Sequence, residues 1–80
     1  MAATNTSIPL GELGAGQTAR VESFHAGRGL VSRLAVLGFL PGQEIKMVQN
    51  FGHGPVIVTV RDTRVALGRH EAEQITVRKA

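Results

Sequence analysis

Residues 33–45 read RLAVLGFLPGQEI, and within this stretch the spacing of apolar residues changes from that of a helix to that of a strand. Before the change, Leu30, Leu34 and Leu37 recur at i, i+4 and i+7, which is the apolar stripe of a short amphipathic helix. The pattern predicts a helix over residues 27–38, with Leu34 and Leu37 facing the core. A chain with this feature has to pass from helix to strand within a few residues.

The corner between these two elements carries its own backbone signals. Gly38 suits the left-handed conformation that ends many helices. Pro41 fixes φ and Gly42 accepts a positive φ, which together favour a tight turn. We therefore expect Gly38, Pro41 and Gly42 to be needed for the geometry of the chain rather than for chemistry. The same corner would plug one end of the fold and start the next strand.

Short alternating apolar segments predict the strands. In the first of them Phe24 falls out of phase by one residue, so a bulge near Glu22 and Ser23 would bring Phe24 inward. The alternation of the second extends to Phe51, and residues 69–74 fit a single helical turn. Five strands with one short helix between the first and the second are typical of a small β-barrel, whose closure removes exposed sheet edges. The expected strands lie at residues 18–26, 44–51, 56–62, 64–68 and 75–79.

The length of 80 residues fits one small domain with a single modest core. Residues 1–9 are polar and small and end in Ile-Pro, so we expect them to form a flexible N-terminal leader. Residues 10–80 would then form the domain, which starts with a loop held by Leu10 and Leu13. The leader lacks the basic and apolar segments of a secretory signal, and none is expected.

The composition argues against several classes of function. Cysteine is absent, which rules out disulfides, thiolate metal sites and cysteine nucleophiles. The longest apolar runs are a few residues, against the roughly 20 that cross a bilayer, so membrane contact is expected only through a partner. The formal charge is +3, but the basic residues are scattered and only three residues are aromatic. Because single-strand binders need aromatic stacking platforms, nucleic-acid binding is not expected.

Neither a catalytic constellation nor a phosphate-binding loop stands out, so we expect no enzyme activity. His70 and Glu73 are spaced i, i+3 and could share one face of a helical turn, where imidazole and carboxylate suit Fe(II) or Zn(II). Surface pairs of this kind are common. We therefore expect no cofactor, and at most weak Fe(II) or Zn(II) binding at this pair.

A partner-binding surface is the remaining hypothesis. Phe39 and Leu40 are adjacent, so strand alternation cannot bury both of them. Exposed apolar residues beside charged ones are typical of protein-binding sites, and Arg28, Arg33 and Glu44 supply such charges near the corner. These five residues form the predicted partner-binding site. The sequence leaves a homodimer open.

Two stretches, RLAVLGFLPGQEIKMV and GPVIVTVRDTRVALGRHEAEQITV, resemble the FeoA family of small ferrous iron transport proteins. The resemblance extends over residues 10–78. No single motif decides it, but the spacing of the whole set is specific. The matching positions are Leu10, Leu13, Gly16, Val21, Arg33, Leu34, Leu37, Gly38, Phe39, Pro41, Gly42, Ile45, Pro55, Val65, Ala66, Leu67, Glu71, Ala72, Ile75 and Val77.

This resemblance implies an SH3-like β-barrel that works in the cytoplasm with a FeoB-type transporter, a membrane protein with a cytosolic G-domain. It implies an accessory or regulatory role in ferrous iron uptake, without catalysis. Two positions depart from the family pattern: Gly68 stands where a basic residue is frequent, and Asp62-Thr63 where a glycine turn is common. The alternatives are a metal-responsive module and a nucleic-acid-binding small barrel.

Overall fold

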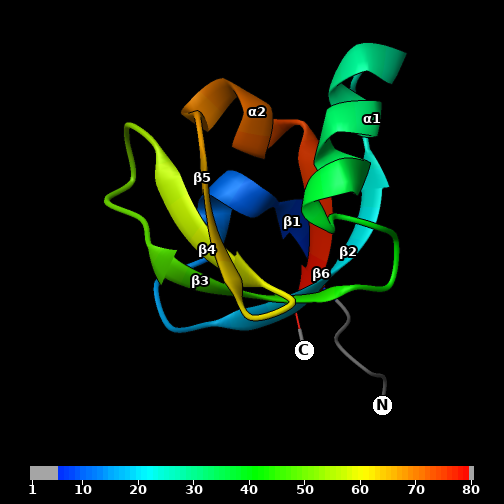
Figure 1. The fold of residues 1–80 in the computed structure, drawn as a ribbon. Helices are drawn as coiled ribbons and strands as arrows, with labels where there is room; N and C mark the ends of the chain where they lie inside the picture. Colours follow the sequence, from blue (N-terminus) through cyan, green and yellow to red (C-terminus); the bar gives the residue numbers. More distant parts are fainter. Residues whose placement is uncertain (1–5, 80) are drawn as a thin grey trace.

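The computed structural model describes residues 6–79 and shows a mainly β domain. One antiparallel sheet holds its strands in the order β1-β6-β2-β3-β4-β5 (Figure 1). Two α-helices and one 3₁₀ helix, η1, connect them. The elements are β1 (Ser7–Pro9), η1 (Leu10–Glu12), β2 (Thr18–Phe24), α1 (Arg28–Leu37), β3 (Glu44–Gln49), β4 (Val56–Val60), β5 (Thr63–Leu67), α2 (Arg69–Glu73) and β6 (Ile75–Lys79).

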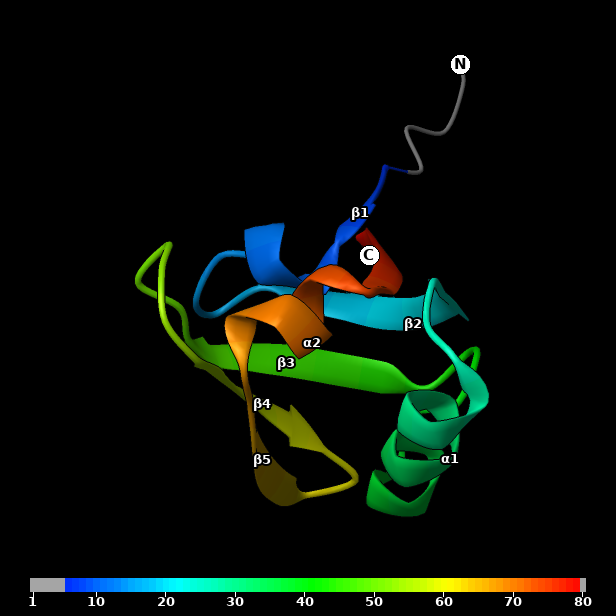
Figure 2. The ribbon, with the colours of Figure 1, turned by 90° about the horizontal axis from the view of Figure 1, so that it is seen from above.

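The sheet bends around one core, and shifts in strand register accompany the bend. The pairing shifts between Val21 and Ser23 on β2, and between Met47 and Gln49 on β3. The first shift confirms the expected bulge, and Phe24 packs against the core from a partly buried position. Seen from above, β2 and β3 run side by side through the middle of the molecule, with α1 beyond one end (Figure 2).

The expected class, mainly β with a short helix between two strands, is confirmed. The sheet is not closed, because among residues 6–79 no pairing joins β1 to β5. β1 has three residues and ends in a proline, which lacks an N–H, so it offers few groups to a further strand. The outer side of β5 therefore remains an edge.

The sequence pattern does not predict β1. Residues 7–9 were expected in the leader, but Ile8 pairs with Val77 on β6 and packs against the core. The N–H of Lys79 also donates to the carbonyl oxygen of Thr6 at 3.0 Å. β6 is thus paired on both sides, with β2 and with β1. The remainder of the expected leader, residues 1–5, lies outside the described residues.

The two hairpin turns differ in detail from the sequence prediction. The turn expected near Asp62-Thr63 lies at Arg61 and Asp62, both with positive φ (52° and 65°), which is the geometry of a type I′ turn. Phe51 lies beyond the end of β3 and is 70% exposed, so it does not continue the inner row of that strand. Asn50 causes this change of direction, since its Oδ1 accepts the N–H of Gly52 at 2.9 Å.

The end of α1 explains which side chain enters the core. Gly38 adopts a left-handed conformation (φ 105°), its N–H donates to Ala35, and the N–H of Phe39 donates to Leu34 at 2.9 Å. These two bonds define a Schellman motif, in which the residue after the glycine packs back onto the last turn. Phe39 is accordingly fully buried, as is Leu34. Phe39 therefore cannot contact a partner, and its prediction as a partner-binding residue was wrong.

The corner also confirms the expected turn. The N–H of Gln43 donates to the carbonyl of Leu40, and Gly42 has φ 90°, as a tight turn with Pro41 at its second position requires. The N–H of Gly42 donates to the carbonyl of Val21 at 2.7 Å. The turn is thereby fixed to β2 as it delivers the chain into β3.

The core is entirely apolar among the described residues. Of the helix α1, Leu34 alone is fully buried, whereas Leu37 is 41% exposed and so does not face the core as expected. No helix in residues 6–79 is long and apolar enough to cross a membrane. The core consists of Leu10, Leu13, Ala19, Val21, Leu34, Phe39, Ile45, Met47, Val56, Val58, Val60, Val65, Leu67, Ala72, Ile75 and Val77.

Candidate functional site

An exposed apolar surface lies at the C-terminal end of α1. Val36 is 87% exposed, Leu37 41% and Leu40 45%. We call these three residues the helix-end surface. Because Leu34 faces the core, Val36 points to the opposite side of the last turn, whereas Leu37 lies nearer to the side of Leu34 but is still partly exposed. The corner described above fixes the place of Leu40 relative to the helix, so the surface is held by the backbone.

The three predicted charged residues occupy different positions around α1. Arg28 is exposed in the first turn of the helix. Arg33 forms an ion pair with Glu71 on α2, and Glu44 lies 3.9 Å from Arg20. Arg33 and Glu44 are therefore engaged within the domain. Arg28 is the member of the predicted set that forms no ion pair among the described residues.

The predicted metal pair is present on α2 but stands alone. His70 and Glu73 are both exposed, on a helix of five residues. Among the described residues, no group of three or more histidine, cysteine, aspartate or glutamate side chains is placed to hold a metal ion. Two exposed donors supply less than the four ligands that stable sites for borderline metals use.

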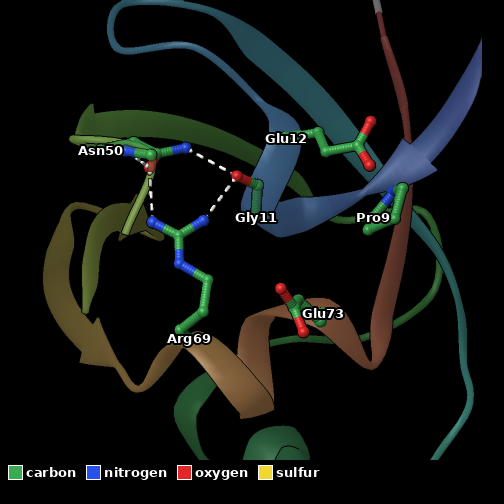
Figure 3. A pocket seen from close by; sticks show the side chains of 7 residues that line it. Pro9, Gly11, Glu12, Asn50, Arg69 and Glu73 are labelled. Atoms are coloured by element: carbon green, nitrogen blue, oxygen red, sulfur yellow. Dashed lines mark hydrogen bonds between the residues drawn. The ribbon is translucent and has the colours of Figure 1, made fainter. Parts of the chain in front are cut away.

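A pocket of about 640 Å³ lies on another side of the domain, between η1, α2 and the β3–β4 loop. Arg69 reaches across it (Figure 3). Its guanidinium donates to the carbonyl of Gly11 at 2.8 Å, to Oδ1 of Asn50 at 2.7 Å and to the carbonyl of Gly54 at 3.0 Å. Asn50 in turn donates to the carbonyls of Gly11 and Leu13, each at 2.8 Å.

This network has a structural role. The donors of Arg69 are directed to backbone and side-chain oxygens of the chain itself, so the arginine ties η1 to the β3–β4 loop. The network also explains why position 11 is a glycine, because a Cβ on Gly11 would lie only 3.0 Å from Nη1 of Arg69. The sequence gives no signal for this role, which depends on contacts between residues up to 58 positions apart.

Glu22 joins three strands on the outer face of the sheet. Its carboxylate accepts a hydrogen bond from Oγ of Ser7 on β1 at 2.6 Å and pairs with Arg78 on β6 at 2.5 Å. The hydrogen bonds from Ser7 and Arg78 hold the pKa of Glu22 below its ordinary value of 4.5. A charged Glu22 thus favours the docking of β1.

We expect this contribution to be lost in acid. A carboxyl group whose pKa is lower in the folded chain stabilises the fold fully above its unfolded pKa, and that stabilisation disappears as the pH falls through the folded pKa. The free energy of unfolding, measured by denaturation between pH 7 and pH 3, should differ most between the wild type and Glu22→Gln at pH 7, and this difference should shrink as the pH falls. In an Arg78→Ala background the difference at pH 7 should already be smaller. A difference that does not depend on pH would contradict this account.

Two members of the helix-end surface escape the sequence analysis. Val36 lies off the apolar stripe of its helix, and an apolar residue out of phase is the signal that could have found it. The second is Leu37, which fits the stripe but lies beyond the part of the helix that the core covers. Both belong to the helix-end surface together with Leu40, which is exposed as predicted.

Comparison with known proteins identifies a family that the chain matches over most of its length. A family model described as FeoA domain matches residues 8–79. A curated protein of Methanocaldococcus jannaschii, named for Fe(2+) transport, is 33% identical over 72 residues, which are 90% of this chain and 87% of that protein.

Solved structures agree with the sequence matches. A structure of an iron uptake regulatory protein (FeoA) has a TM-score of 0.88 at 31% identity, over 94% of this chain and 100% of that chain. A FeoA of Stenotrophomonas maltophilia, solved in complex with zinc and described as an SH3 domain protein, has a TM-score of 0.74 at 38% identity, over 94% and 89% of the two chains. The expected SH3-like character of the fold is thereby confirmed.

Proposed function

Because this chain belongs to the FeoA domain family, we propose that it is a non-enzymatic accessory protein of ferrous iron uptake, which works in the cytoplasm by binding the cytosolic region of a FeoB-type transporter. The family match and the Fe(2+) transport name of the relative support the pathway. The FeoB-type partner is inferred from the family, and the contact surface is argued from the structure of the domain.

The observation that carries the proposal is the helix-end surface. Val36 is almost fully exposed, although valine is a weaker helix former than the charged residues that usually fill such positions. It stands with Leu37 and Leu40 on a segment whose backbone is fixed by the Schellman motif and the turn at residues 40–43. Apolar side chains on a fixed backbone lose little backbone entropy on binding, which favours their use as anchors.

The charged residues nearby would orient the partner as it approaches rather than add to the affinity of the complex. Arg28 is exposed at the other end of α1, whereas Arg33 and Glu44 are held by pairs within the domain. Exposed charges at the rim of an interface mainly change the association rate and its salt dependence. We therefore assign the anchoring role to Val36, Leu37 and Leu40, and the steering role to Arg28.

The test is a titration of the labelled full chain with the cytosolic domain of a FeoB-type transporter. Val36→Ser/Leu40→Ser should weaken binding at least tenfold, about 1.4 kcal/mol, because two apolar anchors are lost. Stability should change little, since both side chains are exposed. Phe51→Ser is the matched control, because it removes an exposed apolar side chain from the β3–β4 loop.

The outcomes separate the surface from the partner. Loss of binding in the double variant with normal binding of the control supports the proposed surface. Equal binding of the wild type and the double variant would remove the helix-end surface from the interface. Failure of the wild type to bind at millimolar concentrations would exclude this domain of the transporter as the partner.

Metal binding is proposed to be secondary. The Stenotrophomonas maltophilia FeoA was solved with zinc, and this chain offers imidazole and carboxylate at His70 and Glu73. Two exposed donors support at most weak binding of Zn(II) or Fe(II). We therefore propose that metal binding at this pair is weak and not required for partner binding.

A further inference from the structure

The outer edge of β5 offers hydrogen-bonding groups that no other part of the described chain uses. β5 is the last strand of the sheet order, and among residues 6–79 it pairs with β4 alone. The type I′ turn makes Val60 and Thr63 the hydrogen-bonded pair that closes the hairpin. Since such pairs alternate with non-bonded ones, Val65 and Leu67 also bond to β4.

It follows that Arg64 and Ala66 direct their backbone groups away from β4. Each presents one N–H and one carbonyl to the outside, which makes four groups in a row along the edge. Outside the regular helices and strands, no backbone hydrogen bond within residues 6–79 involves either residue. Both residues are exposed.

The edge has little of the usual protection against pairing. Natural sheets shield their edges with charged side chains, proline, bulges, very short strands or covering segments, and of these β5 carries the charged side chain of Arg64. β1, at the other end of the sheet, has three residues and ends in proline. β5 has five residues without proline, and it pairs with β4 in unbroken register. Ala66 is also small, so it does not shield the backbone beside it.

Charge indicates the kind of segment that would fit. Arg64 faces outward beside Thr59, and Thr59 pairs with Lys46, so these residues form one row across the outer face. Within the described residues the side chain of Arg64 forms no ion pair. A strand added to β5 would place a side chain beside Arg64, where an acidic residue would be favoured.

We propose that the outer edge of β5 binds an extended acidic segment of a partner protein, which joins the sheet as an additional strand. Main-chain hydrogen bonds to Arg64 and Ala66 supply the attachment, and the side chain of Arg64 selects for acid. A second copy of this chain fits less well. In antiparallel pairing centred on Val65, the two Arg64 side chains would be diagonal neighbours, and both chains carry a net charge of +3. This binding site uses backbone groups of β5 and shares no residue with the helix-end surface.

The first probe is a synthetic peptide, acetyl-Ser-Thr-Glu-Val-Glu-Val-Thr-Ser-amide, and its control carries lysine in place of both glutamates. The full chain, labelled with nitrogen-15, is titrated with each. The acidic peptide should bind at least tenfold more tightly. It should slow hydrogen exchange at the amides of Arg64 and Ala66, while Val65, already bonded to β4, changes little. Equal affinity for the two peptides, or protection located elsewhere, would overturn the proposal.

Variants test the two contributions separately. Ala66→Pro removes one outward N–H without changing the pairing to β4, so it should weaken binding of the acidic peptide at least tenfold. Ala66→Ser keeps this N–H and should leave the binding unchanged. Arg64→Glu should reverse the preference in favour of the lysine peptide. If Ala66→Pro does not fold, the exchange pattern of the wild type decides. Protection of Arg64 and Ala66 that grows with protein concentration alone would identify a second copy as the occupant and overturn the acidic segment.

Discussion

Replacing Phe39 with alanine is expected to lower the free energy of unfolding by about 3–5 kcal/mol. The side chain is fully buried and is the largest in the core. Its removal would leave a cavity at the end of the domain that the corner after α1 closes. Small domains have total stabilities at the lower end of about 5–15 kcal/mol, so the loss would approach the whole stability. Urea denaturation followed by circular dichroism measures the change.

Phe51→Ala is the matched control for this experiment. It is the same substitution at a side chain that is 70% exposed, and it should change stability by less than about 0.5 kcal/mol. If Phe39→Ala does not fold, Phe39→Leu preserves most of the volume and should cost less, about 1.5 kcal/mol or below. Equal effects of alanine at positions 39 and 51 would contradict the placement of Phe39 in the core.

Replacing Arg69 with alanine is expected to cost about 2–3 kcal/mol, because hydrogen bonds from charged groups are worth about 1.5–3 kcal/mol. The substitution removes the donors to Gly11, Asn50 and Gly54 together. For a domain of this size the midpoint of thermal unfolding should fall by roughly 10 °C or more. The β3–β4 loop should also lose protection from hydrogen exchange.

Two further variants separate the fork geometry of Arg69 from its charge. Arg69→Lys keeps the positive charge but cannot reach three acceptors in one plane, so it should recover less than half of the loss. Arg28→Ala removes an exposed arginine and should be nearly neutral. Full recovery by lysine would show that charge alone matters and would contradict the network described above.

Local signals predicted the centre of the fold well. The helix over residues 27–38 and its end at Gly38 follow from short-range rules, since the stripe and the glycine act within one turn. The burial of Phe39 also follows from the Schellman motif, once Gly38 is recognised as the left-handed residue of that motif. Strand alternation was the wrong rule at Phe39, because the residue after a helix-ending glycine packs back on the helix.

The features that the sequence did not predict depend on contacts between distant segments. β1 has three residues, too few for an alternating pattern, and it forms because β6 has a free side to pair with. In the sequence, Arg69 is one of several scattered basic residues. Its role appears only in the fold, where Gly11 and Asn50 lie beside it. The exposure of Leu37 reflects how far the core extends beneath α1, which the helical period does not encode.

The position of β6 between β1 and β2 has a consequence for the synthesis of the chain. A ribosome makes β1 and β2 first, but the strand that joins them is completed only at residue 79. Until β6 is made, β1 has no strand to pair with and β2 lacks one of its two neighbours, so the nascent chain has to remain unfolded or be shielded. Folding of this domain is therefore expected to follow the synthesis of β6 as one late step, rather than to proceed strand by strand.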